Sequence, residues 1–453
     1  MEEKLARKRR VLLVPAPAQG HITPMIQLAT ILHLKGFSIT IAQTKFNYFN
    51  PSNNLSDFQF VTIPENLPES DLKNLGPGRF MIKLAKECCF SFEKWLGLFL
   101  LQQQSINEEI ACVIYDEFMY FVEAAVKEYK LPNVILSTTS ATSFVCRFVM
   151  CKLYAKDGLA PLKEGGGREE ELVPELYPIR YKDLPTSAFA PVDCSVELFK
   201  KTCYTGTASS MIINTVRCLE ISSLEWLQQE LEIPVYPIGP LHMVASVPPT
   251  SLLEENESCI GWLNKRKPSS VIYISLGSMS LMEIKEVFEM ASGLVSSNQH
   301  FLWVIRPESI RDSKFSNDEE LLRKMVTSDR GYIVKWAPQK QVLAHSAVGA
   351  FWSHCGWNST LESLSEGVPM ICRPFTTDQK GNARYLECVW KVGIQVEGEL
   401  ERGAVERAVK RLMVDEEGHE MKVRALSLKE KLKVSVSGEG SSHKSLDDFI
   451  RTL

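Results

Sequence analysis

Residues 336–379 read WAPQKQVLAHSAVGAFWSHCGWNSTLESLSEGVPMICRPFTTDQ, and the middle of this stretch predicts a strand, a turn and a helix. The run Val348–Trp352 is short and apolar, as expected of a buried parallel strand. Residues 353–356 predict a tight turn, and residues 358–366 carry the apolar spacing of a helix. A strand, a turn and a helix in this order indicate one unit of an alternating α/β fold.

The start of this helix is a predicted binding site for a diphosphate. The first N–H groups of a helix lack partners within it, and the helix dipole favours negative charge there. Gly356 has no Cβ, so a ligand can approach the backbone closely. His354, Asn358 and Ser359 add side-chain donors around such a ligand. The alternative is that Asn358 or Ser359 only caps the helix.

The whole stretch from Trp336 to Gln379 closely resembles the signature box of plant secondary-product UDP-glycosyltransferases, which are family 1 glycosyltransferases. The resemblance implies that Trp336 stacks on the uracil ring and that Ala337 and Gln339 lie against the nucleoside. It also implies that Glu362 binds both ribose hydroxyls. The chemistry suits this role, because a carboxylate can accept hydrogen bonds from a vicinal diol.

The end of the box carries the residues that the resemblance assigns to the sugar. Asp378 and Gln379 are similar to the pair that binds the sugar hydroxyls, with Trp357 beside it. Thr376 and Thr377, which precede this pair, are included in the expected donor site. A closing Gln, rather than His, is typical of glucose users in this family. We therefore expect UDP-glucose as a co-substrate.

The same alternation of strands and helices extends over both halves of the chain. The predicted strands are Val11–Val14, Ser38–Ala42, Ala111–Tyr115 and Asn133–Ser137 in the first half, and Ser270–Leu276, Phe301–Ile305 and Gly331–Lys335 in the second. Such alternation predicts mainly parallel sheets with ligands beyond the carboxyl ends of the strands. The expected fold class is therefore α/β, with two Rossmann-like domains facing a central cleft, which the resemblance names the GT-B fold.

The domain boundaries follow from length and from one Pro-rich segment. A chain of 453 residues is too long for one ordinary core. We expect an N-terminal acceptor-binding domain at 1–243, a linker at 244–256 (VASVPPTSLLEEN) and a C-terminal UDP-sugar-binding domain at 257–440. The resemblance implies that a final helix, 441–453, crosses back to the N-terminal domain.

The composition argues against several other classes of protein. The chain is 45% hydrophobic and 23% charged with a formal net charge of −4, so nothing indicates a nucleic-acid partner. No stretch approaches the roughly 20 apolar residues of a transmembrane helix. The apolar run that follows the basic cluster Lys4–Arg10 ends at Pro15 and is too short for a signal peptide. We expect a cytoplasmic monomer without a membrane anchor.

No metal or cofactor is expected. The 12 cysteines form no C-x-x-C pair and fit no zinc pattern, so we expect reduced thiols. No Asp-x-Asp motif is present to hold a divalent ion against the diphosphate. The helix start, His354 and hydroxyl donors would then have to balance the charge of the leaving group.

His21 and Asp116 are the candidate catalytic pair. His21 lies after a strand at the entry to a helix, and an imidazole titrates in the range that a base requires. Asp116 ends an apolar strand, where an unpaired carboxylate is costly. The alternatives are a helix residue without a chemical task and a solvated acid at a strand end. The resemblance favours the pair, because its Gly-His-x-x-Pro motif matches residues 20–24 and its orienting Asp matches Asp116.

The mechanism that this pair implies is inverting. The acceptor oxygen, deprotonated by His21, would attack C1 of an α-linked UDP-sugar and give a β-glycoside, with no carboxylate attacking the sugar. Ser278 resembles a second hydroxyl on the phosphate side. Ser140 is expected to reach the sugar or the diphosphate, and the alternative is that it caps a helix.

The acceptor pocket is the least defined part of the prediction. Aromatic and apolar residues after strand ends suit a flat phenolic acceptor such as a flavonol. The candidates are Phe118, Met119, Phe144, Phe148 and Phe189, with ordinary core as the alternative for each. The most similar plant branch glucosylates flavonols and hydroxylated hormone-like lipids, so a small hydrophobic hydroxylated acceptor, best a flavonol such as quercetin, is expected.

Three other functions remain open at this point. A nicotinamide oxidoreductase would also be α/β, but G-x-G-x-x-G is missing after the first strand of each domain. A sugar-nucleotide epimerase or hydrolase could share the architecture. A non-catalytic UDP-sugar sensor would not depend on His21. An acceptor carboxylate in place of a hydroxyl is a further possibility for a transferase.

Overall fold

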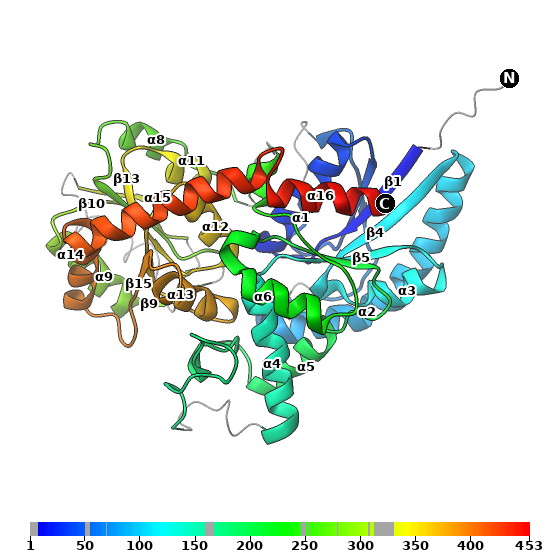
Figure 1. Cartoon of the computed structure of the whole chain (residues 1–453), viewed down its shortest axis with the longest axis horizontal. Helices are drawn as coiled ribbons and strands as arrows, with labels where there is room; N and C mark the ends of the chain where they lie inside the picture. Colours follow the sequence, from blue (N-terminus) through cyan, green and yellow to red (C-terminus); the bar gives the residue numbers. More distant parts are fainter. Residues whose placement is uncertain are drawn as a thin grey trace. The chain divides into compact units, whose positions relative to one another are not determined.

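The structure is a computed structural model that describes residues 8–49, 55–68, 70–158, 167–245, 251, 253–278, 280–306, 309–311 and 330–453. The chain divides into two compact units (Figure 1). Unit 1 comprises Met1–Glu171, Leu184–Leu252 and Val434–Leu453, and unit 2 comprises Leu172–Asp183 and Leu253–Lys433.

Unit 1 is built on a parallel sheet. Its strands are β1 (Lys8–Val14), β2 (Ser38–Gln43), β3 (Gln59–Thr62), β4 (Glu108–Asp116), β5 (Asn133–Ser137), β6 (Ser210–Ile213) and β7 (Val235–Pro237). They lie in the order β3-β2-β1-β4-β5-β6-β7, and every neighbouring pair is parallel. The register pairs Val14 of β1 with Tyr115 of β4, so the carboxyl ends of these two central strands meet at one edge.

The helices of unit 1 cover this sheet. They are α1 (Gln19–Leu34), α2 (Ser70–Ser105), α3 (Val122–Glu128), α4 (Ala141–Asp157), α5 (Val192–Thr202), α6 (Arg217–Glu230), α7 (Leu241–Val244) and α16 (Ser441–Thr452), with the short 3-10 helix η2 (Glu117–Met119) after β4. Helix α2 is interrupted at Gly76, which has φ 70° and precedes Pro77. A proline disfavours helical backbone angles for the residue that precedes it. Only glycine adopts this positive φ without strain.

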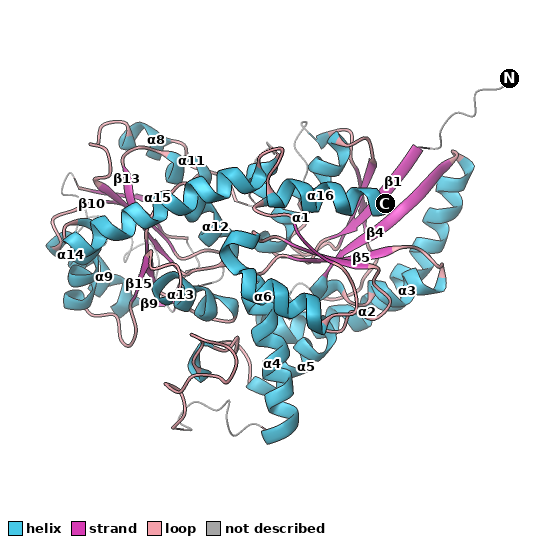
Figure 2. Ribbon diagram, viewed as in Figure 1, coloured by secondary structure: helices cyan, strands magenta, loops and turns pink. Residues whose placement is uncertain are grey.

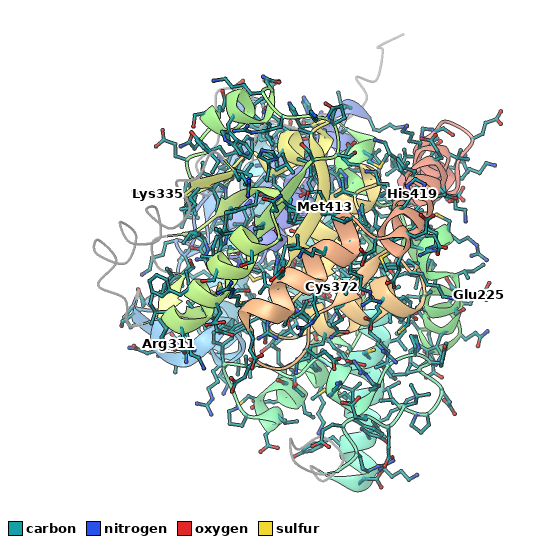
Figure 3. The ribbon with its side chains drawn as sticks, turned by 90° about the vertical axis from the view of Figure 1, so that its left-hand side faces the viewer. Glu225, Arg311, Lys335, Cys372, Met413 and His419 are labelled. Atoms are coloured by element: carbon teal, nitrogen blue, oxygen red, sulfur yellow. The ribbon has the colours of Figure 1, made fainter. Side chains whose placement is uncertain are left out.

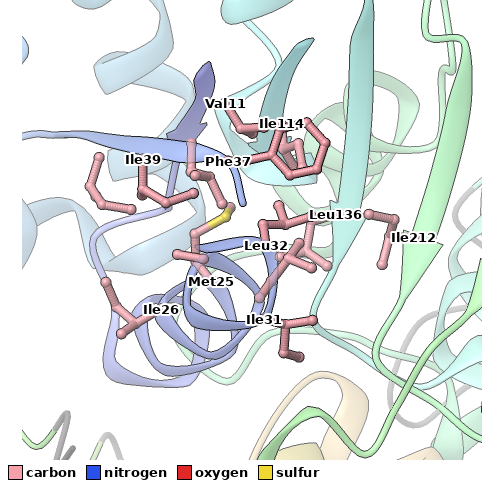
Figure 4. Packing of buried hydrophobic residues seen from close by; sticks show 14 of the residues in the cluster. Val11, Met25, Ile26, Ile31, Leu32, Phe37, Ile39, Ile114, Leu136 and Ile212 are labelled. Carbon is pink, nitrogen blue, oxygen red and sulfur yellow. The ribbon is translucent and has the colours of Figure 1, made fainter. Parts of the chain in front are cut away.

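The core between α1 and the sheet explains why these segments fold as they do. Met25 and Leu32 on the buried side of α1 pack with Val11 of β1 and Ile114 of β4, and all four have 0% exposure (Figure 4). Phe449 of α16 joins the same cluster and is also fully buried. The C-terminal helix is therefore part of the hydrophobic core of unit 1 rather than an appendage.

Unit 2 repeats the plan with a second parallel sheet (Figure 2). Its strands are β8 (Val271–Ser275), β10 (His300–Val304), β12 (Gly331–Val334), β13 (Val348–Ser353), β14 (Met370–Cys372) and β15 (Gly393–Gln395), in the order β12-β10-β8-β13-β14-β15. A two-stranded ribbon joins β9 (Met282–Glu283) and β11 (Ile310–Arg311). All of these pairs are parallel.

Helices also surround the sheet of unit 2. They are α8 (Ser258–Leu263), α9 (Ile284–Ser296), α11 (Gln339–Ala344), α12 (Trp357–Ser365), α13 (Asp378–Cys388), α14 (Arg402–Met413) and α15 (Glu416–Val436), with the 3-10 helix η4 (Tyr181–Asp183). Cys372 of the sheet strand β14 is fully buried, whereas His419 of helix α15 is exposed; both are labelled in Figure 3. None of the described helices is both long and apolar enough to cross a membrane.

The two-domain α/β architecture with parallel sheets is confirmed, and several segments differ from the sequence prediction. Residues Leu172–Asp183, expected within 1–243, have their contacts in unit 2. Unit 1 takes Val434–Leu453, a longer C-terminal segment than the expected 441–453. Of the predicted linker at 244–256, residues 246–250 and 252 lie outside the described residues. The sequence did not predict strands β3, β6, β7, β14 and β15, each of which has only three or four residues.

Candidate active site

The structure brings the predicted pair of unit 1 together. His21 lies in the first turn of α1, just after β1, and Asp116 is the last residue of β4. Because β1 and β4 are parallel neighbours, the two side chains meet at the carboxyl edge of the sheet. His21 Nδ1 lies 2.7 Å from Asp116 Oδ2.

Asp116 is not the solvated acid that the sequence left open. It has 0% exposure, and its Oδ1 accepts a hydrogen bond from the Phe118 backbone N–H at 3.0 Å. Its two oxygens are therefore divided between the backbone and His21. A buried carboxylate held in this way fixes the tautomer of the imidazole, with the proton on Nδ1 and Nε2 left to take up another.

Thr138, which the sequence analysis did not single out, joins this pair. It follows β5 and its Oγ1 lies 2.9 Å from His21 Nδ1. The Phe118 ring meets the His21 ring edge-on, with centroids 5.2 Å apart and an interplanar angle of 90°. The position of Thr138 at the end of a third neighbouring strand is the signal that could have identified it.

A second buried carboxylate was missed by the sequence analysis. Glu117 follows Asp116 directly, has 1% exposure and forms an ion pair with Arg147 of α4 at 3.0 Å. Burial raises the pKa of Glu117, while the guanidinium of Arg147 opposes that rise. A charged cluster therefore lies directly beside the His21–Asp116 pair.

In unit 2 the predicted strand-turn-helix is present, and it surrounds His354 with glycine. Strand β13 ends at Ser353, and α12 begins at Trp357 with Gly356 as its N-cap. A Cβ on Gly356 would lie 2.5 Å from His354 Nε2, and one on Gly277 would also overlap the ring. Gly277 has φ +74°, so two features reserve this position for glycine.

His354 is uncharged at neutral pH. Burial, and secondarily the positive charge of Arg306, lowers the pKa of His354 to about 4. Arg306 donates from Nε to the Gly277 carbonyl and from Nη2 to the Ser280 carbonyl, both at 2.9 Å, and so holds the turn after β8. The ring can therefore offer a diphosphate a neutral N–H donor beside the start of α12.

The predicted ribose residues form a connected cluster. Gln339 donates from Nε2 to Ser359 Oγ at 2.9 Å and to Glu362 Oε2 at 2.8 Å. Tyr273 donates from its hydroxyl to Gln339 Oε1 at 3.2 Å. Burial raises the pKa of Glu362 above its ordinary value, and the hydrogen bond from Gln339 opposes this rise. Asn358 and Ser359 do not cap α12, because Gly356 occupies the N-cap position.

Trp336 lines a cavity of about 780 Å³ in unit 2. The other lining residues are Glu254, Glu255, Asn256, Glu257 and residues 331–335. Asn256 donates from its backbone N–H to the Trp336 carbonyl at 3.0 Å, which fixes the backbone that carries the indole. Ala337, beside it, is 4% exposed. A cavity of this size is in the range of ordinary ligand pockets.

The predicted sugar residues open helix α13. Gln379 accepts through Oε1 from the backbone N–H groups of Phe375 at 2.8 Å and Thr376 at 3.0 Å. The oxygen of this amide is thus occupied by backbone, and its NH2 group is the end suited to a sugar hydroxyl. Thr377 has φ 50° and donates to Asp378 Oδ1 at 3.1 Å.

Asn382 is a site residue that the sequence analysis missed. Its Nδ2 donates to Asp378 Oδ2 at 3.1 Å and to the Cys355 carbonyl at 3.0 Å, and the residue is 3% exposed. It therefore links the predicted sugar residue to the phosphate turn. Its spacing of four residues from Asp378, one helical turn, is the signal that could have found it.

The segment Leu172–Asp183 packs on helix α13. Arg384 donates from Nε to the Pro178 carbonyl at 2.9 Å, and its Nε lies 3.8 Å from Asp183 Oδ2. Arg180 bonds Asp183 at 2.8 Å and Glu397 at 2.8 Å. The contacts of Arg384 therefore fasten the helix that carries Asp378 to a segment far from it in sequence, and Arg180 fastens that segment to Glu397.

Three predicted donor residues are placed in other ways. Ser278 is exposed in the turn after β8. Ser140 is the N-cap of α4 and accepts from the Ser143 N–H at 3.0 Å, as the capping alternative required. Trp357 is 3% exposed and packs against Trp390, with ring centroids 6.2 Å apart. Its indole therefore anchors the first residue of α12 in the core.

The acceptor candidates do not form one group. Met119 and Phe144 have 0% exposure, which agrees with the core alternative for these two residues. Phe148 packs against Trp226 of α6 with ring centroids 5.4 Å apart, and Phe189 lies beside Gly76. Phe118 is the candidate that contacts His21.

No metal centre is evident in the described ranges. Among these residues, no group of three or more His, Cys, Asp or Glu side chains could hold a metal ion. The described cysteines form no disulfide with one another, and burial raises the pKa of several of them.

Known proteins resemble this chain over its whole length. A family model described as "UDP-glucoronosyl and UDP-glucosyl transferase" matches residues 234–431. The chain is 83% identical over 453 residues to UDP-glycosyltransferase 76E7 of Arabidopsis thaliana, covering 100% of both proteins. It is 69% identical over 459 residues to Flavonol 3-O-glucosyltransferase UGT76E12 of Arabidopsis thaliana, covering 100% of this chain and 99% of the relative.

A solved structure shares the fold. It is that of Phytolacca americana UGT2 complexed with UDP-2fluoro-glucose and pterostilbene. Its TM-score to this chain is 0.80 at 25% identity, covering 98% of this chain and 99% of that one.

Proposed function

Because the chain belongs to the UDP-glycosyltransferase family, we propose that it transfers glucose from UDP-glucose to a hydroxyl of a small plant metabolite, with a flavonol as the first candidate. The family and its GT-B fold establish glycosyl transfer. The choice of acceptor is supported by the relative that is a flavonol 3-O-glucosyltransferase, which is 69% identical to this chain.

The observation that carries the mechanism is the 2.7 Å contact between His21 Nδ1 and Asp116 Oδ2. With Nδ1 held, Nε2 takes the proton of the acceptor hydroxyl as its oxygen attacks the anomeric carbon. The bond between that carbon and the UDP oxygen breaks, and UDP leaves with the electron pair. Attack from the face opposite UDP converts an α-linked donor into a β-glucoside. Asp116 stabilises the imidazolium that results.

The donor site is proposed from the contacts within unit 2. Trp336 would stack on uracil above the cavity it lines, and Glu362 would accept from the ribose hydroxyls once these replace the amide of Gln339. Asp378, oriented by Asn382, and the NH2 group of Gln379 would bind the glucose hydroxyls.

The leaving diphosphate is proposed to be stabilised without a metal or a cofactor. The N–H groups at the start of α12 and the His354 ring supply fixed donors, and the Ser278 hydroxyl is exposed in the neighbouring turn. Such donors act without reorganising when the bond to UDP breaks. Addition of a chelator should leave the activity unchanged.

The test is an acceptor panel with UDP-glucose, read by mass spectrometry for a gain of one hexosyl unit. The panel contains flavonols, hydroxylated lipids and aromatic carboxylates, so that the acceptor class is an outcome. His21→Ala should abolish the product while UDP binding, measured by calorimetry, is retained. His33→Ala is the matched control, because His33 lies in the same helix and its Nε2 is 3.8 Å from Asp57.

Two outcomes would overturn the proposal. Full activity of His21→Ala would remove the base from the mechanism. Free glucose or an epimerised nucleotide sugar, formed without any glycoside, would assign the chain to hydrolysis or epimerisation instead.

A further inference from the structure

Two consecutive carboxylates are buried next to the proposed base. Asp116 has 0% exposure and Glu117 has 1%. Burying one ionised carboxylate is costly, and two adjacent ones disfavour each other's charge unless each has a partner. The catalytic pair uses only Asp116, so the presence of Glu117 needs a separate explanation.

Glu117 has a partner of its own in Arg147, which is 2% exposed. Arg147 Nη2 donates to Glu117 Oε1 at 3.0 Å and to Oε2 at 3.1 Å. The same nitrogen donates to Thr139 Oγ1 at 2.8 Å, and the Ser137 hydroxyl donates to Glu117 Oε1 at 3.3 Å. The second carboxylate is thus held on the side of α4.

Aromatic rings surround the guanidinium of Arg147. Its central carbon lies 4.9 Å from the Phe144 ring centroid, 5.6 Å from that of Phe118 and 5.7 Å from that of Phe199. The Phe118 ring is the one that meets His21 edge-on. One aromatic ring therefore contacts both the His21–Asp116 pair and the Glu117–Arg147 pair.

Two thiols near Arg147 are uncharged. Burial raises the pKa of Cys203 to about 12, and burial also raises the pKa of Cys151, although Arg147 opposes both shifts. Glu117 itself is influenced by Arg147, Asp116 and His21, besides its own burial. Asp116, Glu117, Arg147 and His21 are therefore charged or chargeable groups that interact at this edge of the sheet.

We propose that Arg147 is a positioning residue that sorts the two carboxylates, binding Glu117 so that Asp116 is left to orient His21. This inference rests on the proposed function, because it concerns the state of the proposed base. The guanidinium is a permanent cation with several donors, so without Glu117 it pairs with the next carboxylate along the chain, Asp116. Asp116 is then drawn away from His21, and an uncompensated positive charge disfavours the imidazolium.

The inference predicts an unusual order of activities. Glu117→Gln, which keeps the cation and removes its partner, should lower kcat/KM at least tenfold. The double variant Glu117→Gln with Arg147→Met, which removes both charges, should be about tenfold more active than Glu117→Gln, because interacting buried charges are not additive. The acid limb of the pH profile of kcat/KM should move by about one unit to lower pH in Glu117→Gln and return in the double variant.

The matched control is Glu108→Gln. Glu108 begins the same strand that Asp116 ends, about 25 Å away along the strand, and it pairs with Arg10 at 2.6 Å. This variant loses a carboxylate partner of an arginine in the same sheet, so it reports the structural cost alone. It should keep the wild-type pH profile. UDP affinity, which the proposed donor site in unit 2 sets, should be unchanged in every variant, and thermal unfolding followed by circular dichroism serves as the test of folding.

The outcomes separate the inference from the function on which it rests. A wild-type pH profile in Glu117→Gln, or a double variant whose loss is the product of the two single losses, would overturn the sorting role. If His21→Ala is inactive and Glu117→Gln is unaltered, only this inference fails, whereas an active His21→Ala removes the proposed mechanism itself. Should Glu117→Gln not fold, Arg147→Lys is measured. The inference requires it to keep the pH profile, because the cation remains, and a shifted acid limb would contradict it.

Discussion

His21 and His354 occupy equivalent places in the two units, and their surroundings give them opposite properties. Each follows a parallel strand and stands at the beginning of a helix. His21 meets a fully buried carboxylate at 2.7 Å. His354 instead packs against the backbone of Gly277 and Gly356, and burial and Arg306 lower its pKa to about 4.

The difference shows that the fold supplies a position and the neighbours decide the chemistry. A carboxylate beside an imidazole stabilises its protonated form, so His21 is suited to accept a proton. Burial beside a cation destabilises that form, so His354 is suited to donate a hydrogen bond while remaining neutral. One histidine is prepared for proton transfer and the other for binding.

The largest effect should come from Asp116→Asn, which removes the carboxylate charge that His21 contacts. Oδ1 of Asp116 accepts from the Phe118 N–H, so an asparagine would keep its oxygen there and turn its NH2 group toward His21 Nδ1. That stabilises the wrong tautomer, with the proton on Nε2, and kcat/KM should fall by about 10³-fold. Steady-state kinetics measure the loss, and calorimetry should show unchanged UDP binding. A loss below tenfold would contradict the orienting role.

The second effect concerns the stability of unit 2 in acid. The pKa of His354 is about 4 when folded and 6.5 in the unfolded chain, so between these values the unfolded state binds the extra proton. Stability is therefore present above the unfolded value and is lost as pH falls through this window, by at most about 3 kcal/mol.

Urea unfolding of the wild type and of His354→Gln, at about pH 7.5 and about pH 5, measures this contribution. The wild type should lose about 2 kcal/mol more than the variant on acidification. If the wild type and the variant lost equal free energy of unfolding, His354 would not be held neutral by its surroundings. The proposed difference between His21 and His354 would then be wrong.

A third prediction tests the close contact of Gly277 with the His354 ring. Gly277→Ala adds a Cβ that overlaps the His354 ring at a position with φ +74°, so either the ring or the turn must move. UDP-glucose affinity should fall about 30-fold, or about 2 kcal/mol, as one phosphate donor is displaced. Gly398→Ala is the control, because it also has positive φ (+75°) but no atom within 4 Å of an added Cβ. If Gly277→Ala and Gly398→Ala lowered the affinity for UDP-glucose equally, the loss would come from backbone strain and not from contact with the His354 ring.

The smallest effect should come from Arg384→Gln, which loosens segment Leu172–Asp183 from α13. Loss of the bond to the Pro178 carbonyl should raise the KM for UDP-glucose about threefold, with UDP affinity unchanged, since α13 carries the predicted sugar residues Asp378 and Gln379. Arg424→Gln is the matched control, because Arg424 Nε also donates to a backbone carbonyl, that of Lys391, at 2.7 Å. Equal changes for UDP and UDP-glucose would contradict a role confined to the sugar.

Much of the fold could be predicted from local patterns. Strand β5 spans Asn133–Ser137 as predicted, and β4, β8 and β13 fall within a few residues of their expected ends. These central strands are buried on both faces, so their sequences are continuous apolar runs. The edge strands β3 and β15 have four and three residues, which is too short for such a run, and their pairing is decided by the neighbouring strand.

The candidate site divides in the same way. The predicted donor residues of the box lie within 44 residues of one another (336–379), so the resemblance of this one stretch to a known signature box was enough to propose them. Thr138 and Arg147 escaped the sequence analysis, because each contacts a residue that only folding brings near. The same holds for the bond from Asn382 to the Cys355 carbonyl. The segment Leu172–Asp183 escaped for the same reason, since its partner Arg384 is about 200 residues away.

Local apolar spacing in the sequence predicted the alternating fold, because a chain displays such spacing without being folded. The resemblance of short motifs to a known family predicted the donor class and the proposed base. The tertiary structure alone decided that Asp116 is buried against His21, that Glu117 is paired with Arg147 and that His354 is neutral. The reason is physical: desolvation and Coulomb interactions depend on distances through space, and residues far apart in sequence set them.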